Sequence, residues 1–268
     1  ALCFTVFAVL AVLIRRVYAD EIEYMRQCCD LIVGNHGSVD RIIPFMQCVN
    51  TSITLQEQDV LLDMASGKVG PSLGVGIVTF ASSNIWEYSG YSLAVNGLYA
   101  ELNGYAMKHI DPSMTNPEPL DSRWSKIALL IDALEDSNAW GRDMNYVVWF
   151  DADLIVLDLQ LRLESVAAAS PQAHIIASAE HAGSSTIINS GSILVRNTAW
   201  ARQFLRKWWG TAGERRLFSD QEKFDQVYLS LTARERPKVQ ILPPDAINSD
   251  PPAMTMLERH NQVLHLMG

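Results

Sequence analysis

Short apolar runs alternate with amphipathic stretches along most of the chain after residue 72. Residues 75–80 (VGIVTF) and 146–150 (YVVWF) are continuous apolar runs rich in β-branched and aromatic side chains, which is typical of strands buried on both faces. Residues 125–136 carry apolar side chains at the spacing i, i+3, i+4 and i+7, which predicts a helix with one apolar face. Further strands are expected at residues 105–110, 174–179, 193–196 and 239–242, and further helices at residues 88–103, 198–209 and 221–231. This alternation predicts an α/β fold with a mostly parallel central sheet and helices on both faces.

The N-terminal part of the chain lacks this alternation. Residues 1–14 are almost wholly apolar and end at Arg15-Arg16, so residues 1–19 are expected to be a signal anchor or a cleaved signal peptide. Fourteen residues are fewer than the roughly 20 that cross a membrane, and the chain does not begin with Met, so we expect this segment to be incomplete. A buried core helix is the third interpretation. Residues 20–72 are expected to form a stem or linker, and residues 73–268 the main domain, truncated at its C-terminus.

Composition and charge narrow the classes of protein to consider. The chain has 268 residues, 49% of them hydrophobic, so wholesale disorder is excluded because there is ample apolar surface to bury. The 21 Lys and Arg residues against 30 Asp and Glu residues give a net charge of −9, which argues against a nucleic-acid partner. An anionic ligand therefore needs a local source of positive charge, such as a metal ion, a helix N-terminus or a single lysine at the binding site. All four cysteines lie within the first 48 residues, so the main domain is expected to be built without disulfides, and a bridge from Cys28 or Cys29 to Cys48 stays open.

Two carboxylates follow the most apolar predicted strand. Asp151-Ala152-Asp153 comes directly after YVVWF, and open α/β sheets bind their ligands at the carboxyl ends of strands. Residues i and i+2 of an extended segment point the same way, so both carboxylates can face one ion. Mg²⁺ and Mn²⁺ prefer such oxygen ligands and commonly bridge them to phosphates. The motif predicts a metal and diphosphate site, and the alternative is a strand-end pair that caps a loop.

Three other segments carry side chains suited to a phosphate or a sugar. Lys126 stands at the start of a predicted helix, where it can supply positive charge to a diphosphate; a solvated surface lysine is the alternative. Asn189 and Gly191 suit a loop that approaches a sugar closely, or else a plain turn between two strands. Asp220 and Gln221 stand where another helix is predicted to begin, a position at which Asp is a good cap.

Five segments in the same order resemble the nucleotide-sugar-dependent glycosyltransferases of the GT-A fold. They are residues 123–127 (RWSKI), the DxD motif at residues 151–153, residues 189–198 (NSGSILVRNT), residues 218–221 (FSDQ) and residues 260–268 (HNQVLHLMG). The resemblance covers roughly residues 74–268. Among subfamilies, the sequence looks closest to the galactosyl- and xylosyl-transferases of fungal mannan and plant xyloglucan synthesis.

The resemblance implies a role for each matching residue. Asp151, Asp153 and His265 would bind Mn²⁺ or Mg²⁺, and Asn189, Asp220 and Gln221 would lie by the transferred sugar. The residues implied to contact the nucleotide-sugar donor are Thr79, Ala81 and Ser82 for the base, and Arg123, Lys126, Asp151, Ala152, Asp153 and Gly191 for the diphosphate and sugar. The metal ion would neutralise the charge on the leaving group.

The activity implied is transfer of a hexosyl or pentosyl unit from a nucleotide-diphosphate sugar to a glycan acceptor, with retention of anomeric configuration. A non-catalytic carbohydrate-binding protein of the same fold is one alternative. A phosphatase with an aspartate nucleophile is another, although its DxD motif normally follows the first strand of the domain, and here about three predicted elements precede the motif.

The expected location is a membrane of the Golgi or secretory pathway, with the catalytic domain in the lumen as in a type II membrane protein. The N-terminal segment would attach the protein to that membrane, and Asn50-Thr51-Ser52 is a glycosylation sequon that suits a lumenal stem. Arg15-Arg16 points the other way, because positive residues after an apolar segment favour the cytosolic side.

Overall fold

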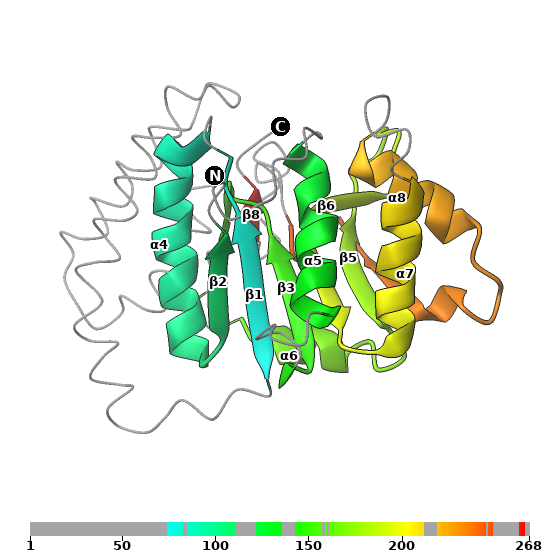
Figure 1. Cartoon of the computed structure of the whole chain (residues 1–268), viewed down its shortest axis with the longest axis horizontal. Helices are drawn as coiled ribbons and strands as arrows, with labels where there is room; N and C mark the ends of the chain where they lie inside the picture. Colours follow the sequence, from blue (N-terminus) through cyan, green and yellow to red (C-terminus); the bar gives the residue numbers. More distant parts are fainter. Residues whose placement is uncertain are drawn as a thin grey trace.

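Six strands form the central sheet, in the order β2-β1-β3-β6-β5-β7 (Figure 1). The computed structural model describes residues 74–82, 85–110, 122–135, 143–156, 159, 161–211, 219–244, 246–248 and 263–265. The strands are β1 (Val75–Phe80), β2 (Ala106–Ile110), β3 (Tyr146–Phe150), β4 (Leu154–Val156), β5 (Ile175–Ala179), β6 (Ile188–Arg196), β7 (Val239–Leu242) and β8 (Val263–His265). The helices are α4 (Trp86–Asn103), α5 (Ser125–Glu135), α6 (Leu163–Ala168), α7 (Ala199–Gly210) and α8 (Asp220–Leu229), with short 3₁₀ turns η3 (Ser122–Trp124) and η6 (Arg236–Lys238).

The sheet is parallel apart from one strand. β1 pairs in parallel with both β2 and β3, and β5 pairs in parallel with β7. β6 lies between β3 and β5 and is antiparallel to both. β4 and β8 pair with each other in a separate two-stranded sheet. The mostly parallel central sheet predicted from the sequence is thereby confirmed.

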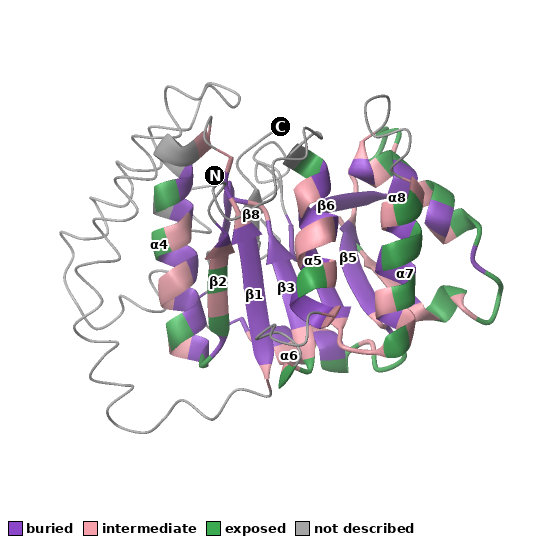
Figure 2. Ribbon diagram, in the orientation of Figure 1, coloured by how far each residue is buried: buried purple, intermediate pink, exposed green. Residues whose placement is uncertain are grey.

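Helices cover both faces of the sheet. Along β3, Val147 and Trp149 belong to the core that contains side chains of α5, α7 and α8, whereas Val148 and Phe150 belong to the core that contains side chains of α4 and α6. Side chains alternate between faces along a strand, so a strand buried on both sides reads as an unbroken apolar run. Figure 2 shows the central strands buried along most of their length and the helices buried on one side only.

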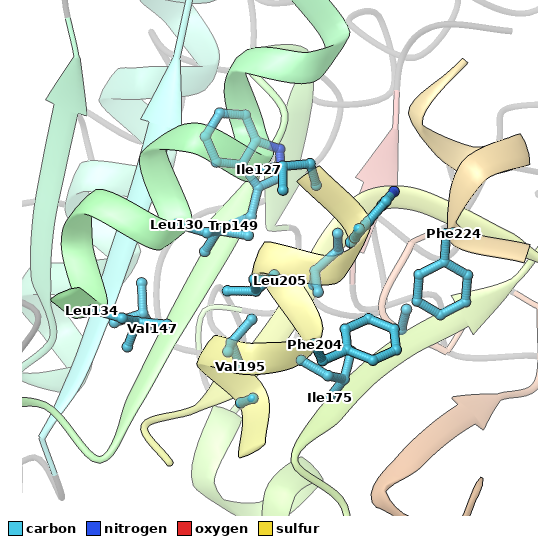
Figure 3. Close-up of a cluster of buried hydrophobic side chains, with 14 of the residues drawn as sticks. Ile127, Leu130, Leu134, Val147, Trp149, Ile175, Val195, Phe204, Leu205 and Phe224 are labelled. Atoms are coloured by element: carbon cyan, nitrogen blue, oxygen red, sulfur yellow. The ribbon is translucent and has the colours of Figure 1, made fainter. Parts of the chain in front are cut away.

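The larger of the two cores is built around aromatic rings on α7 and α8 (Figure 3). Phe204 stacks on Trp200 at a ring-centroid distance of 5.4 Å, and Trp208 packs edge-on against Phe224 at 5.1 Å. Trp200, Phe204 and Trp208 recur every fourth residue, so they lie on one face of α7. This aromatic layer fixes α8, and with it Asp220 at the first turn of α8, against the sheet.

Some elements differ from those expected. β6 begins at Ile188 rather than at residue 193, so Asn189 and Gly191 lie inside a strand and not in a loop or turn. The pairing of β5 with β6 shifts register between Ala177 and Ser178, which opens the ladder just where these residues enter it. β4, β8 and α6 were not expected, because three to six residues are too few to show a periodic pattern.

The expectations for the N-terminal part of the chain concern residues outside the described ranges. These are the apolar segment at residues 1–19, the stem at residues 20–72, the four cysteines and the sequon at Asn50. Within the described ranges, no helix has the length and apolar character needed to span a membrane.

Candidate active site

Polar side chains from four separate elements meet at one edge of the sheet. The carboxyl ends of the parallel strands β1, β3 and β5 share this edge, and the antiparallel β6 begins there. Asp151 follows β3, Glu180 follows β5, Ser190 lies near the start of β6, and Asp220 begins α8. This is the edge at which open α/β sheets bind ligands.

A buried lysine stands at the centre of this group. The Nζ atom of Lys126 on α5 lies 3.1 Å from Oδ1 of Asp151 and 3.5 Å from Oδ2 of Asp220. It also donates hydrogen bonds to the carbonyl and hydroxyl oxygens of Ser190, at 3.2 and 2.9 Å. The Lys126 side chain is only 5% exposed, so the alternative of a solvated surface lysine is wrong.

The charge of Lys126 is maintained by its two carboxylate neighbours. Burial by itself lowers the pKa of this ammonium group, but Asp151 and Asp220 raise it by more, and the pKa stands above its ordinary value. Lys126 is therefore a fixed cation at neutral pH. Both carboxylates are held toward that cation before any ligand binds, which is the preorganisation that electrostatic catalysis requires.

Asp151 is held by three contacts, two through its carboxylate and one through its backbone. Lys126 contacts it from α5, and the indole Nε1 of Trp149 donates a hydrogen bond to Oδ1 at 2.5 Å. The backbone N–H of Asp151 donates to the carbonyl oxygen of Gly191 on β6, at 2.8 Å. Trp149 and Asp151 are two residues apart along an extended segment, so their side chains point the same way. That spacing was a usable sign of the contact in the sequence.

Ser190 connects Lys126 to the start of α8. Its hydroxyl accepts from Lys126 and lies 2.7 Å from Oδ2 of Asp220, so the hydroxyl hydrogen is directed to that carboxylate. The indole Nε1 of Trp208 donates to the backbone carbonyl of Asp220 at 2.8 Å. The N-cap of α8 is Ser219, which leaves the Asp220 side chain in the first helical turn, where a negative charge is favourable.

Gln221 is oriented by three acceptors. Its Nε2 atom donates to the carbonyl oxygen of Ile188 at 2.8 Å, and to Oε2 of Glu180 and Oγ1 of Thr186, both at 3.2 Å. Gln221 and Asp220 thus both lie at this edge of the sheet, and their place beside the transferred sugar stays a prediction. Glu180 was not predicted, because one acidic residue after a strand is too common to single out.

Asn189 is the remaining predicted sugar-binding side chain, and its amide is fixed by two donors. Oδ1 of Asn189 accepts from the backbone N–H of Gly191 at 3.0 Å and from Nδ2 of Asn248 at 2.5 Å. Asn248 lies in the segment after β7, and no pattern in the sequence marked it. With Oδ1 occupied, the Nδ2 end of Asn189 is the end suited to donate to a ligand hydroxyl.

The second half of the DxD motif turns away from the central sheet. Ala152 and Asp153 form the turn between β3 and β4, and both are buried. β4 pairs with β8 so that Leu154 lies opposite His265, which places the backbone of His265 beside the residue that follows Asp153. The side chain of His265 is outside the description, and the described residues contain no group of three His, Cys, Asp or Glu side chains arranged to hold a metal. The set Asp151, Asp153 and His265 stays a prediction.

The carboxylates at the site suit a divalent cation. Asp151 and Asp153 lie on either side of Ala152 at this edge of the sheet, and Asp220 lies near Asp151, on the other side of the Lys126 ammonium. The donor set, with two carboxylates that flank one turn, is of the oxygen-rich kind that Mg²⁺ and Mn²⁺ prefer.

Solved structures of glycosyltransferases share this arrangement of strands and helices. A glycosyltransferase involved in the glycosylation of the major capsid of PBCV-1 gives a TM-score of 0.60 at 15% identity, over 73% of this chain and 93% of that one. The galactosyltransferase LgtC, in complex with donor and acceptor sugar analogs, gives 0.48 at 13% identity over 72% of this chain and 87% of its own. The glycosyltransferase GlyE of Streptococcus pneumoniae TIGR4 gives 0.42 at 15% identity over 75% and 49%. The chain has a GT-A fold.

Because the identity to the PBCV-1 protein is only 15%, this similarity shows the fold and not the activity. The TM-scores of 0.48 for LgtC and 0.42 for GlyE are too low to support a further conclusion. No protein-family model and no curated protein matches the sequence. The GT-A fold places the predicted base-binding residues at the carboxyl end of β1, where Thr79 and Ala81 are buried and Ser82 is half-buried. Arg123 is exposed in η3, three residues before Lys126. The roles of these residues stay predictions.

Proposed function

We propose that the protein is a metal-dependent glycosyltransferase, which moves a hexosyl or pentosyl unit from a nucleotide-diphosphate sugar to a glycan acceptor. One observation carries the proposal. The Asp151 carboxylate is fixed at the carboxyl end of β3, beside a buried Lys126 and Asp220, at the ligand-binding edge of a GT-A sheet. The five-segment resemblance in the sequence supports the same activity.

Asp151, Asp153 and His265 would hold Mn²⁺ or Mg²⁺. When bound, the ion supplies Lewis-acid stabilisation of the diphosphate leaving group. Ala152 and Gly191 would approach the donor with their backbone, and Arg123 and Thr79, Ala81 and Ser82 would contact the diphosphate and the base. These assignments rest on the resemblance and on the position of the residues at the carboxyl edge.

The side chains of the site would bind and orient the sugar. Asn189 would donate from Nδ2 to a sugar hydroxyl, since its Oδ1 is held by Gly191 and Asn248. Asp220 would face the positive charge that develops on the sugar ring as the glycosidic bond breaks, and Gln221 would orient the sugar beside it. Lys126 and Ser190 keep the Asp220 carboxylate in place, so little reorganisation is needed when that charge appears.

We infer retention of anomeric configuration from the family resemblance, with the departing phosphate oxygen taking the proton of the acceptor hydroxyl. In this pathway Asp220 stabilises charge and forms no covalent bond to the sugar.

We also propose that the segment at residues 1–19 attaches the protein to a Golgi or secretory membrane with the catalytic domain in the lumen.

The first test is thermal stabilisation of the full chain by UDP, GDP and their sugar conjugates, with Mn²⁺ or with EDTA. A ligand at about one hundred times its Kd adds about 2.7 kcal/mol, which for a domain of this size raises Tm by roughly 5–10 °C. The shift should require Mn²⁺ and should vanish in Asp151→Asn and Asp153→Asn. Asp143→Asn, on an exposed residue before β3, is the matched control and should keep the shift.

Turnover separates the proposal from its alternatives. Donor hydrolysis or transfer that needs Mn²⁺ supports the transferase. Binding of a nucleotide sugar without any turnover would indicate a carbohydrate-binding protein of the same fold. Absence of nucleotide binding, together with hydrolysis of phosphate esters and an acid-labile phosphate on Asp151, would replace the proposal with a phosphatase.

A further inference from the structure

One face of α4 is polar although it is buried. Ser92, Asn96, Tyr99 and Asn103 follow one another at intervals of four, three and four residues, which places them on one side of the helix. All four are no more than 3% exposed. We call these four residues the α4 polar face. Buried polar groups destabilise a fold unless they are hydrogen-bonded, so each of these four side chains is expected to have a hydrogen-bond partner.

The partners are backbone groups of the DxD motif and of the segment that follows it. The hydroxyl of Ser92 donates to the carbonyl of Ala152, the central residue of the motif. Nδ2 of Asn96 donates to the carbonyl of Leu154 at 2.7 Å, while its Oδ1 accepts from the N–H of Val156 at 3.0 Å. Further along the helix, Tyr99 Oη donates to the carbonyl of Leu161 at 2.7 Å, and Asn103 Nδ2 donates to that of Leu159 at 2.9 Å.

The amide of Asn96 takes the place of a neighbouring strand. The carbonyl of Leu154 and the N–H of Val156 point to the same side of β4, because residues i and i+2 of a strand share their orientation. β8 pairs along the other side of β4. One side-chain amide therefore satisfies the donor and the acceptor that a further strand would satisfy, and without it two buried backbone groups would lose their partners.

β4 needs this support because it does not belong to the central sheet. Asp151 is fixed on the sheet side by Gly191, Lys126 and Trp149. Asp153 lies beyond the turn, next to β4, which hydrogen-bonds to β8 and not to any of the six sheet strands. The hydrogen bonds from Asn96 of α4 to β4 therefore help to set the position of Asp153 relative to Asp151.

We propose that Ser92 and Asn96 are positioning residues for the metal-binding turn. They hold Ala152 and β4, and through β4 also β8 with His265, in place against Asp151. The inference rests on the proposed function, since it assigns these residues a role in binding the metal and the donor. Tyr99 and Asn103 have a different role, because their hydrogen bonds go to the carbonyls of Leu161 and Leu159, which lie beyond β4.

Asn96→Ala and Asn103→Ala form a matched pair for the test. Both remove a buried asparagine amide from the same helix face, and both should lower Tm. The readout is the Mn²⁺ concentration that gives half-maximal thermal stabilisation of the full chain by UDP or GDP, whichever stabilises the wild type. We expect Asn96→Ala to raise this concentration about tenfold, the lower range for residues that orient metal ligands. Asn103→Ala should leave it within about twofold of the wild type, the scatter expected for a site that does not touch the metal.

Ser92→Ala keeps the test open if Asn96→Ala fails to fold. It removes the hydrogen bond to the carbonyl of Ala152 and adds no charge, so we expect a smaller rise in the Mn²⁺ requirement and faster hydrogen exchange in residues 151–156. Equal Mn²⁺ requirements in Asn96→Ala, Ser92→Ala and Asn103→Ala would overturn the inference and leave α4 a purely structural role. A wild type that neither nucleotide stabilises with Mn²⁺ would instead refute the proposed function, and the inference with it.

Discussion

Replacing Lys126 with Met tests whether the buried cation holds the site together. Met fills much of the same volume but carries no charge, so Asp220 would keep a carboxylate that is only 2% exposed without its ammonium partner. Breaking a buried pair by removing one partner costs about 3–5 kcal/mol. Asp151 is 23% exposed, so water replaces part of what it loses. We therefore expect a loss of free energy of unfolding near the lower figure, about 3 kcal/mol.

The measurement is urea unfolding at pH 7.5 followed by tryptophan fluorescence and circular dichroism. Lys126→Met should lower the denaturation midpoint without a change in m-value. Asp220→Asn added to Lys126→Met removes the unpaired charge and should restore part of the loss. Lys207→Met, on an exposed lysine that bonds Ser230, is the control and should change the free energy of unfolding by less than about 0.5 kcal/mol. A loss below about 1 kcal/mol in Lys126→Met, or a double variant no more stable than the single one, would refute the reasoning.

Substitutions at three further positions are tested by the same unfolding measurement. Trp149→Phe removes the indole N–H bond to the DxD carboxylate and should cost about 1.5 kcal/mol, so an unchanged midpoint would contradict that bond. Ser219→Ala removes the N-cap of α8 and should cost about 1 kcal/mol, whereas Ser219→Gly should cost less. Burial and the charges of Arg196 and Lys238 lower the pKa of His174, so the unfolded chain binds more protons than the folded one below about pH 6.5. Stability should fall as the pH drops through that range, and His174→Gln should make the fall shallower; identical slopes would rule this out.

The sequence predicted best those strands that are buried on both faces. β1 and β3 have the bounds expected from their apolar runs, because a strand covered by helices on both sides has no polar alternation to blur its ends. The edge strand β7 also has its expected bounds, although only Val239 of its four residues is buried. The α/β fold with a mostly parallel sheet followed from the order of these runs and the helices between them, whereas the GT-A fold was implied by the five-segment resemblance. The position of Asp151 followed as well, since the carboxyl end of a central parallel strand can lie at one edge of the sheet only.

The contacts between distant residues could not be predicted in the same way. Lys126 looked equally suited to solvent, because its burial depends on Asp151 and Asp220, which lie far along the chain. Ser190 is a small polar residue in a strand, and nothing local indicates that it connects a lysine to a helix start. Asn96 was hidden for the opposite reason, since a buried polar face makes a helix look weakly amphipathic.

The site is assembled from both sides of the sheet, and Asp151 lies where the two sides meet. Lys126, Trp149 and Asp220 come from the elements around the α5, α7 and α8 core, and they fix the Asp151 carboxylate with a permanent cation. Asp153 comes from the side of α4 and β4, where Ser92 and Asn96 hold the backbone of the turn and of β4.

In this arrangement Lys126, the permanent cation, and the proposed divalent ion lie on different sides of Asp151. A lysine on one side of Asp151 bridges the Asp151 and Asp220 carboxylates, and the turn that carries Asp153 is held by α4 on the other side. A divalent ion bound there would not have to displace the lysine. Variants on the two sides should therefore affect different quantities. Lys126→Met should mainly lower the free energy of unfolding, since its charge is structural. Asn96→Ala should mainly raise the Mn²⁺ concentration needed for stabilisation by the nucleotide. If both variants changed both quantities in the same ratio, Asp151 would be responding to a single cation site, and the two-sided arrangement would have to be abandoned.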